Sequence, residues 1–428
     1  MTDVWTAGRI DARAQASLGI ISQIFMLLML LTSLIGSGCM ATISQSLGAG
    51  LRRRAERYAG LIVLLSALSG TGIAAAALPC GPAIYSLMQV PVEIRPVLAS
   101  FFTAYCLHLP FFYVLIMVNS IFRAHKKVML PFLTLLLMAL LNVLGDLGFG
   151  LGWFGLPAFG AAGVAWTTFA CAVAGLLCNL LLARAGGFLT RKAFAPWRWN
   201  KRAMPYLFRV GAPAAAGQIL GKTGDLVTLA MLGALAADST NVLAGMSVAA
   251  RIYAFVLFPL EAVNMSMSIL SGHMLGARQH DGLYALGLRA GIAEALILAL
   301  LSALLWLFRA PVVAFFSTDG RVAEEAVLFL LFSCLSGPLF GLAGAFNSIF
   351  AGTGATMISC RIYAATCWLV GIPLSWLLGV RFGAAGIYAA GLAARGIAAV
   401  WTAHVFRGRT WLGYGLRKRK NTPTPETA

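Results

Sequence analysis

The sequence predicts an all-α polytopic membrane protein built from two similar helical bundles. Of its 428 residues, 60% are hydrophobic and 11% are charged, whereas a soluble domain carries about 25% charged residues. The hydrophobic residues fall in long runs, which can cross a hydrocarbon core about 30 Å thick as helices. Short motifs also recur at a fixed spacing along the chain. The length of the runs and the recurrence of the motifs together define the fold class.

Eleven hydrophobic stretches are expected to span the membrane. They are residues 17–46, 58–79, 97–122, 128–152, 161–184, 205–234, 242–275, 284–308, 326–350, 357–380 and 384–406. The segment 80–96 contains or adjoins four prolines. Because proline removes a helical hydrogen bond, we expect this segment to lie at the membrane interface and not to span it.

Basic residues predict the orientation of these spans. The formal net charge is +18, which in a soluble protein would indicate nucleic acid as a partner. Here the lysines and arginines lie in alternate connections, such as Arg52–Arg54 and Arg191–Arg202, and in the C-terminal tail. The positive-inside rule places basic loops in the cytoplasm. We therefore expect a bacterial inner-membrane protein with a cytoplasmic C-terminus and no nucleic-acid partner.

An internal repeat divides the spans into two halves. The motif NSIF begins at Asn119 and again at Asn347, and the motif LGA begins at Leu47 and again at Leu275, with the same spacing. Six crossings separate equivalent positions, so both halves have the same orientation, as in a parallel repeat. In the LGA motifs we expect Gly48 and Gly276 to end their helices in a left-handed conformation.

The repeat also predicts the domain organisation. We expect an N-terminal bundle of five spans, a basic cytoplasmic linker, a C-terminal bundle of six spans and a basic cytoplasmic tail. Their bounds are 1–190, 191–204, 205–407 and 408–428. The first half is one helix short, with Asp3 matching Asp225. We therefore expect either that the true start lies upstream or that the protein is truncated.

Four motifs in this order resemble the multidrug and toxic compound extrusion (MATE) family. The first is QSLGAG at 45–50. The second is the pair Asn142 and Asp146, followed by FGAAGVAW at 159–166. The third is GAPAAAGQ at 211–218, and the fourth is HMLGAR at 273–278, which repeats the first. The resemblance extends from Asp3 to about residue 407. It implies two six-helix bundles that face a central cavity. It also implies a functional acid near the end of the first helix, to which Asp3 is similar.

Acids within the spans are the candidate cation-coupling residues, because a charge at the bilayer centre costs about 2.5–3.5 kcal/mol on insertion scales. The resemblance favours this role for Asp146; the alternative is a solvated helix end. Asp225 lies one turn from Lys222, so it is either a cavity acid or half of a simple ion pair. Asp3 is its counterpart in the first half.

Glu261 is the fourth candidate. It follows Pro259 within a span, and either lines the cavity or pairs with Arg251 or a neighbouring helix. Glu294 and Arg395 also lie within spans, and the sequence assigns neither a role.

The resulting hypothesis is a secondary antiporter that exports amphipathic organic cations in exchange for protons or sodium ions. A substrate cavity would be lined by Asn142, Gln218, Phe255, Asn264 and Met265. The aromatic ring of Phe255 would attract a cation, and the thioether of Met265 would adapt to varied shapes. Two alternatives stay open. One is a flippase for lipid-linked oligosaccharides with a basic cavity, and the other is a degenerate paralogue that does not transport.

Several function classes lack their motifs. No GxxxxGK[ST], HExxH or GxSxG sequence occurs, and the eight cysteines include no CxxC pair. ATP binding through a P-loop, zinc-protease and hydrolase chemistry are therefore not expected. We expect a monomeric transporter that is not an enzyme, with no cofactor or metal, whose partners are a small-molecule substrate, a coupling ion and the bilayer.

Overall fold

The computed structural model describes residues 2–236 and 238–416, apart from the side chain of Leu30. Within these residues every regular element is helical and no strand occurs. The α-helices are α1 (Thr2–Ile10), α2 (Ala12–Leu30), α3 (Thr32–Gly48), α4 (Arg52–Leu87), α5 (Arg95–Ala124), α6 (Met129–Gly145), α7 (Gly160–Ala185), α8 (Trp197–Leu235), α9 (Ser239–Gly276), α10 (His280–Leu307), α11 (Arg309–Phe316), α12 (Gly320–Thr353), α13 (Thr356–Ala364) and α14 (Ile372–Arg407). The π-helices η1 (Asp146–Gly150) and η4 (Ala365–Gly371) adjoin α6 and α13, and three short 3₁₀ turns, η2 (Trp153–Gly155), η3 (Arg191–Ala193) and η5 (Thr410–Tyr414), complete the set.

The helices are long and apolar enough to make this a polytopic membrane protein. Nine helical segments of the described chain satisfy both criteria, and helix covers most of each expected span. The last segment, Thr356–Arg407, holds two expected spans. They meet at Gly383, where φ is +57° and the helix breaks. The all-α membrane fold predicted from the hydrophobic runs is therefore confirmed.

The first part of segment 80–96 continues helix α4, and the interfacial position expected for this segment stays a prediction. Helix α4 continues through Pro79 and Pro82 to Leu87, and the chain leaves the helix only between that residue and α5. The extension holds because it packs on α5: Tyr85 is buried, with its ring edge against Phe102 at a centroid distance of 5.6 Å. Membrane helices tolerate proline where neighbouring helices support the interrupted turn.

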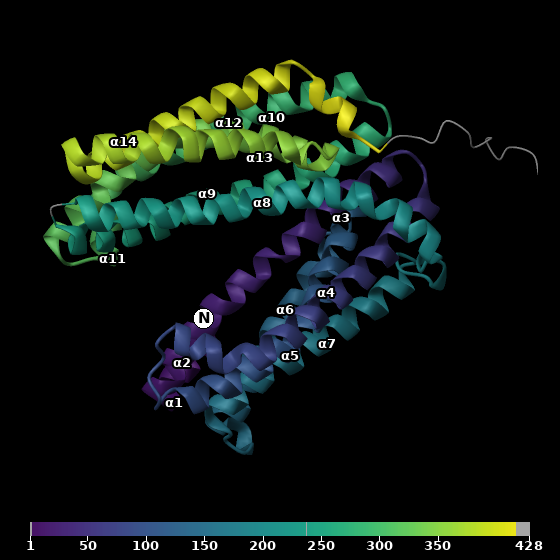
Figure 1. Cartoon of the computed structure of the whole chain (residues 1–428), viewed down its shortest axis with the longest axis horizontal. Helices are drawn as coiled ribbons and strands as arrows, with labels where there is room; N and C mark the ends of the chain where they lie inside the picture. The colour runs from purple at the N-terminus through teal and green to yellow at the C-terminus, as the bar shows by residue number, and fades with distance from the viewer. Residues whose placement is uncertain (1, 237, 417–428) are drawn as a thin grey trace, which may run out of the picture. The chain divides into compact units, whose positions relative to one another are not determined.

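Contacts between Cα atoms divide the chain into two compact units. Unit 1 comprises Met1–Ile43 and Leu51–Gly211, and unit 2 comprises Ser44–Gly50 and Ala212–Ala428. In unit 1, α5 packs against α4 and α7; in unit 2, α12 packs against α10 and α14 (Figure 1). Since α5 and α12 carry the two NSIF motifs, the sequence repeat is also a repeat of helix packing.

The glycines of the LGA motifs do not have the left-handed conformation that we expected. Gly48 and Gly276 are the last helical residues of α3 and α9. The positive φ angles occur two residues later, at Gly50 (+73°) and Arg278 (+61°). The expectation was wrong because both helices run further than the motif alone indicates.

These two glycines instead permit close backbone contact within unit 2. A Cβ atom at Gly48 would lie 2.0 Å from the carbonyl oxygen of His273, and one at Gly276 would lie 2.2 Å from the carbonyl oxygen of Gln45. Gln45 and His273 are themselves equivalent in the repeat. The same glycine-to-carbonyl contact therefore occurs twice, at equivalent positions of the repeat. Small residues permit such close backbone contacts in many pairs of membrane helices.

The C-terminal segment folds back onto the same region. Trp411 is fully buried, stacks on Phe406 at a centroid distance of 5.1 Å and donates a hydrogen bond to its carbonyl oxygen at 2.9 Å. The side chain of Gln45 donates to the carbonyl of Gly352 at 2.9 Å and accepts from the backbone N–H of Leu416 at 2.9 Å. Segment 44–50, the end of α12 and the C-terminal segment therefore form one packed cluster.

We predict that Gly276→Ala destabilises the protein by about 1–3 kcal/mol, the usual cost of overpacking. Gly72→Ala is the matched control, because a Cβ there meets no atom within 4 Å and alanine favours helix. Thermal unfolding in detergent measures both. Equal stability of the two variants would contradict the close contact.

Trp411→Ala is expected to cost about 3–5 kcal/mol, because it removes a fully buried aromatic side chain. Trp411→Phe keeps the ring stack but loses the indole hydrogen bond, which is worth about 1 kcal/mol. Chemical unfolding of both variants would rank them. An alanine variant no less stable than the phenylalanine variant would show that the segment is not packed as described.

Candidate functional site

Asp146 is the most deeply buried acid of unit 1. It is 0% exposed, and neither carboxylate oxygen has a hydrogen-bond partner among the described residues. The residue opens the π-helix η1, which contacts α1 and α7. Such π-helical turns within membrane helices are frequent at functional sites. The local departure from α-helix therefore coincides with the buried acid.

Three other helices bring polar side chains to Asp146. Asp3 on α1 interacts electrostatically with its carboxyl, and Tyr105 on α5 interacts with both acids and contacts Thr168 on α7. Asn142, one turn before Asp146, donates a hydrogen bond to the Thr168 hydroxyl at 3.5 Å. The structure thus unites three of the predicted residues, Asp3, Asn142 and Asp146, in one acidic site.

This arrangement is suited to binding a small cation. Burying a carboxylate without a hydrogen-bond donor is costly, and two carboxylates that share one site cannot both ionise freely. A proton on one carboxyl, or a monovalent cation bound between them, relieves both costs. Within residues 2–236 and 238–416, no group of three His, Cys, Asp or Glu side chains has an arrangement suited to a metal ion.

An apolar groove of about 680 Å³ lies beside this acidic site, between α6, η1 and α7. Its lining includes Leu141, Phe149, Phe159 and Trp166. Cys171, which also lines the groove, interacts electrostatically with Asp146. The groove therefore reaches the immediate surroundings of the buried acid.

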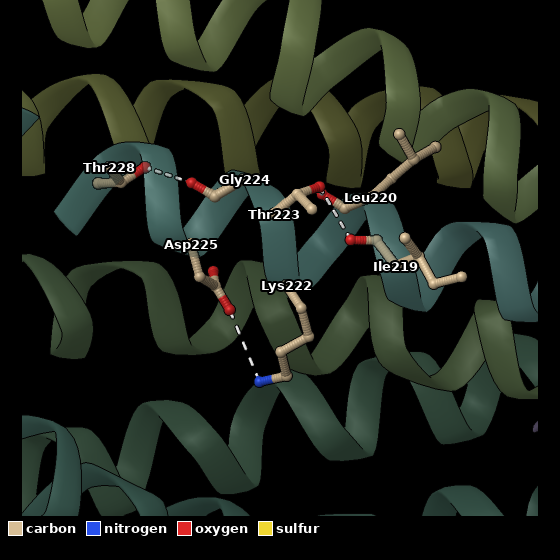
Figure 2. Close-up of polar contacts among 7 residues, drawn as sticks. All are labelled: Ile219, Leu220, Lys222, Thr223, Gly224, Asp225 and Thr228. Carbon is tan, nitrogen blue, oxygen red and sulfur yellow. Dashed lines mark hydrogen bonds and ion pairs between the residues drawn. The ribbon is translucent and has the colours of Figure 1, made fainter. Parts of the chain in front are cut away.

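Asp225 has a different environment from its counterpart Asp3. Figure 2 shows its carboxylate on the same side of α8 as Lys222, and an oxygen lies 3.7 Å from the lysine Nζ. The two side chains are 71% and 54% exposed. The simple ion pair is therefore formed. Asp225 also interacts electrostatically with Tyr363 and Cys367, near η4.

The other predicted residues lie in unit 2. Glu261, Phe255 and Met265 are exposed along α9, and Gln218 is exposed on α8. Asn264 is half-buried and accepts a hydrogen bond from Ser348 at 2.7 Å. These residues contribute polar, aromatic and thioether groups to the surface of unit 2.

Two residues that the sequence could not place stand out in the structure. Tyr105 gives no motif signal, because an aromatic residue in an apolar span is ordinary. Glu294 was visible as an acid in a span, but its neighbours were not. It is 2% exposed on α10, and neither carboxylate oxygen has a hydrogen-bond partner in the described chain.

Ionisable residues buried between membrane helices are typical of ion and substrate pathways in membrane transport proteins. The model of the MatE family matches residues 1–147 and 213–377. The chain therefore belongs to the MatE family, whose members are transporters, so its partners include a small-molecule substrate and the membrane.

Individual relatives are similar over nearly the whole chain. The uncharacterized transporter YisQ of Bacillus subtilis is 24% identical over 94% of this chain and 88% of its own length. The probable multidrug resistance protein NorM of Thermotoga maritima is 21% identical over 91% and 83%. The crystal structure of the Vibrio cholerae MATE transporter VcmN in the bent form superimposes with a TM-score of 0.87, at 18% identity, over 97% of this chain and 93% of that one.

We predict that Asp225→Asn changes the free energy of unfolding by less than about 1 kcal/mol, because exposed ion pairs contribute little. Lys222→Gln should have the same small effect, since either change breaks the same pair. Thermal unfolding in detergent measures both. A loss well above this limit in either variant would show that the pair faces an apolar environment instead of water.

Proposed function

We propose that this protein is a secondary antiporter that exports amphipathic organic cations in exchange for protons or sodium ions. The observation that carries the proposal is the acidic site of unit 1, where the buried Asp146 lacks a hydrogen-bond partner in the described chain and interacts with Asp3. A transporter driven by an ion gradient requires a site whose charge changes during the cycle. This pair of carboxyls supplies one.

Cation binding at this site would be linked to the position of α1. Helix α1 contacts α2, α7 and η1, and it carries Asp3 opposite Asp146. When no cation is bound, repulsion between the carboxylates opposes this packing; when one is bound, the repulsion is gone. By linkage, any conformation that favours the packed α1 binds the cation more tightly.

Substrate chemistry is proposed from two observations. NorM is named a probable multidrug resistance protein, which supports an exporter of organic compounds. The α9 face of unit 2 exposes Phe255 and Phe258, in edge-to-face contact at 6.0 Å, together with Met265. Aromatic faces attract organic cations, and methionine adapts to varied apolar shapes.

The basic residues of the spans give less support to a lipid-linked oligosaccharide flippase. Lys222 pairs with Asp225, and Arg395 donates a hydrogen bond to the Ser336 hydroxyl at 2.8 Å. These two cations are therefore engaged by other side chains, whereas the third basic residue considered for this alternative, Arg251 on α9, is exposed. We further propose a monomer in the bacterial inner membrane with its basic loops and C-terminus in the cytoplasm.

Asp146→Asn is predicted to slow cation-driven efflux at least about tenfold, which corresponds to about 1.4 kcal/mol of lost driving interaction. The assay is release of protons from energised inside-out vesicles on addition of ethidium or tetraphenylphosphonium, repeated with sodium gradients. Glu324→Gln, an exposed acid on α12, is the control and should behave as the wild type.

Two outcomes would contradict the proposal. If gradient-driven efflux survives in Asp146→Asn, the acidic site of unit 1 does not couple ion movement to efflux. If wild-type vesicles show neither proton-coupled nor sodium-coupled efflux, antiport of these substrates is excluded. The flippase and the degenerate paralogue would then be the hypotheses to test.

A further inference from the structure

The second unit contains a buried carboxyl that the proposed antiport at Asp146 does not use. Glu294 lies midway along α10, within a helix long and apolar enough to cross the membrane. Its side chain is 2% exposed. No donor of the described chain reaches either carboxylate oxygen. An ionised carboxylate in such surroundings is costly, so Glu294 requires a compensating positive charge or a bound proton.

The side chain of Glu294 lies beside α12, where the backbones of α10 and α12 pack closely. A Cβ at Gly341 of α12 would lie 2.7 Å from the carbonyl oxygen of Glu294, so the two helix backbones touch at this level. Small residues permit such contacts between membrane helices. One helical turn along α12, Gly344 faces both Glu294 and Asn264. A Cβ there would lie 3.8 Å from the Glu294 Oε2 and 3.3 Å from the Asn264 Nδ2.

Polar groups from α9 and α12 converge at the same point. The Ser348 hydroxyl donates to the Asn264 Oδ1 at 2.7 Å and to the carbonyl oxygen of Gly344 at 2.9 Å. Glu261, about one turn before Asn264, interacts electrostatically with Glu294. Glu294, Asn264 and Ser348, with the exposed Glu261 beside them, therefore form a polar cluster in unit 2, which we call the α10 cluster.

Two basic side chains on other helices of unit 2 have partners away from Glu294. On α14, the Arg395 guanidinium donates to Ser336, and Phe406 is the residue that meets α10 at Gly287. On α11, Arg309 donates to the carbonyl oxygen of Trp306 and stacks on its ring. Among the described residues, Glu261 is thus the charged group found to act on Glu294, and its negative charge opposes ionisation.

We propose that the α10 cluster is a proton-binding site in which Glu294 takes up and releases a proton, independently of the acidic site in unit 1. Uptake converts the Glu294 carboxylate to a carboxylic acid and needs no other reactant. Glu261 modulates the site by its charge. Asn264 and Ser348 keep the wall beside the carboxyl polar.

Position in the repeat separates this cluster from the unit 1 site. In the register of the NSIF motifs, the residue equivalent to Glu294 is Ser66 on α4, whose hydroxyl donates to the Val63 carbonyl of its own helix. The acids Asp3 and Asp146 lie on α1 and η1, which correspond to other elements of unit 2. The α10 cluster is therefore an addition to the second half and not a copy of the first site.

Infrared spectroscopy of the full-length protein in detergent tests the proposal, because a protonated carboxyl has a C=O stretching band that its ionised form lacks. A wild-type pH titration should show such a band, reversibly lost at high pH and absent from Glu294→Gln. The band should persist in Asp146→Asn and in the exposed control Glu324→Gln. Glu261→Gln should keep the band but lose it at a lower pH, because the opposing charge is gone.

Three outcomes would overturn the proposal. The first is a spectrum of Glu294→Gln, with wild-type thermal stability, that equals the wild type at every pH. The second is a Glu294 band that persists at every pH at which the protein stays folded. The third is loss of the band at constant pH on adding sodium, which would identify a sodium site. The titration involves no transport, so its result is separate from that of the efflux assay.

Discussion

The constraint on which this structure depends is the cost of placing a carboxyl group inside a bundle of apolar helices. A helix satisfies its own backbone hydrogen bonds, but it offers nothing to an acidic side chain that points between helices. Asp146 and Glu294 are buried in this way, and neither has a hydrogen-bond partner in the described chain. An ionised carboxylate in such surroundings needs a compensating positive charge or a bound proton. The proposed antiport supplies the coupling cation at Asp146, and the proposed α10 cluster supplies a proton at Glu294.

The two halves share their packing and differ in their chemistry. Both contain a π-helix before the FGAAG motif, η1 in unit 1 and η4 in unit 2. In the register of that motif, Asp146 of η1 corresponds to Leu369 of η4. Asp225 retains the position of Asp3 but is exposed and paired with Lys222. Unit 2 instead carries its buried acid on α10. Duplication therefore preserved the scaffold while the acids diverged.

Much of the fold followed from the sequence, because hydrophobic run length determines which segments cross a membrane and the repeat determines which helices correspond. Part of the acidic site could also be predicted, because Asn142 and Asp146 lie one turn apart and belong to the same family motif. The length of α4 could not be read from local signals, because the helix continues past Pro79 where Tyr85 packs on α5. The surroundings of Glu294 were not predictable, because Asn264 and Ser348 belong to other helices and meet it only after α9, α10 and α12 have packed.

The most direct measurement of the central claim is proton release by the purified protein when it binds an organic cation. Calorimetric titration with tetraphenylphosphonium in two buffers of different ionisation enthalpy counts the protons released, without a membrane or a gradient. If the carboxyls of unit 1 exchange a proton for substrate, the wild type should release protons and Asp146→Asn should release fewer. Equal heats in both buffers for the wild type, in sodium-free solution and with tight binding, would contradict proton exchange at this site.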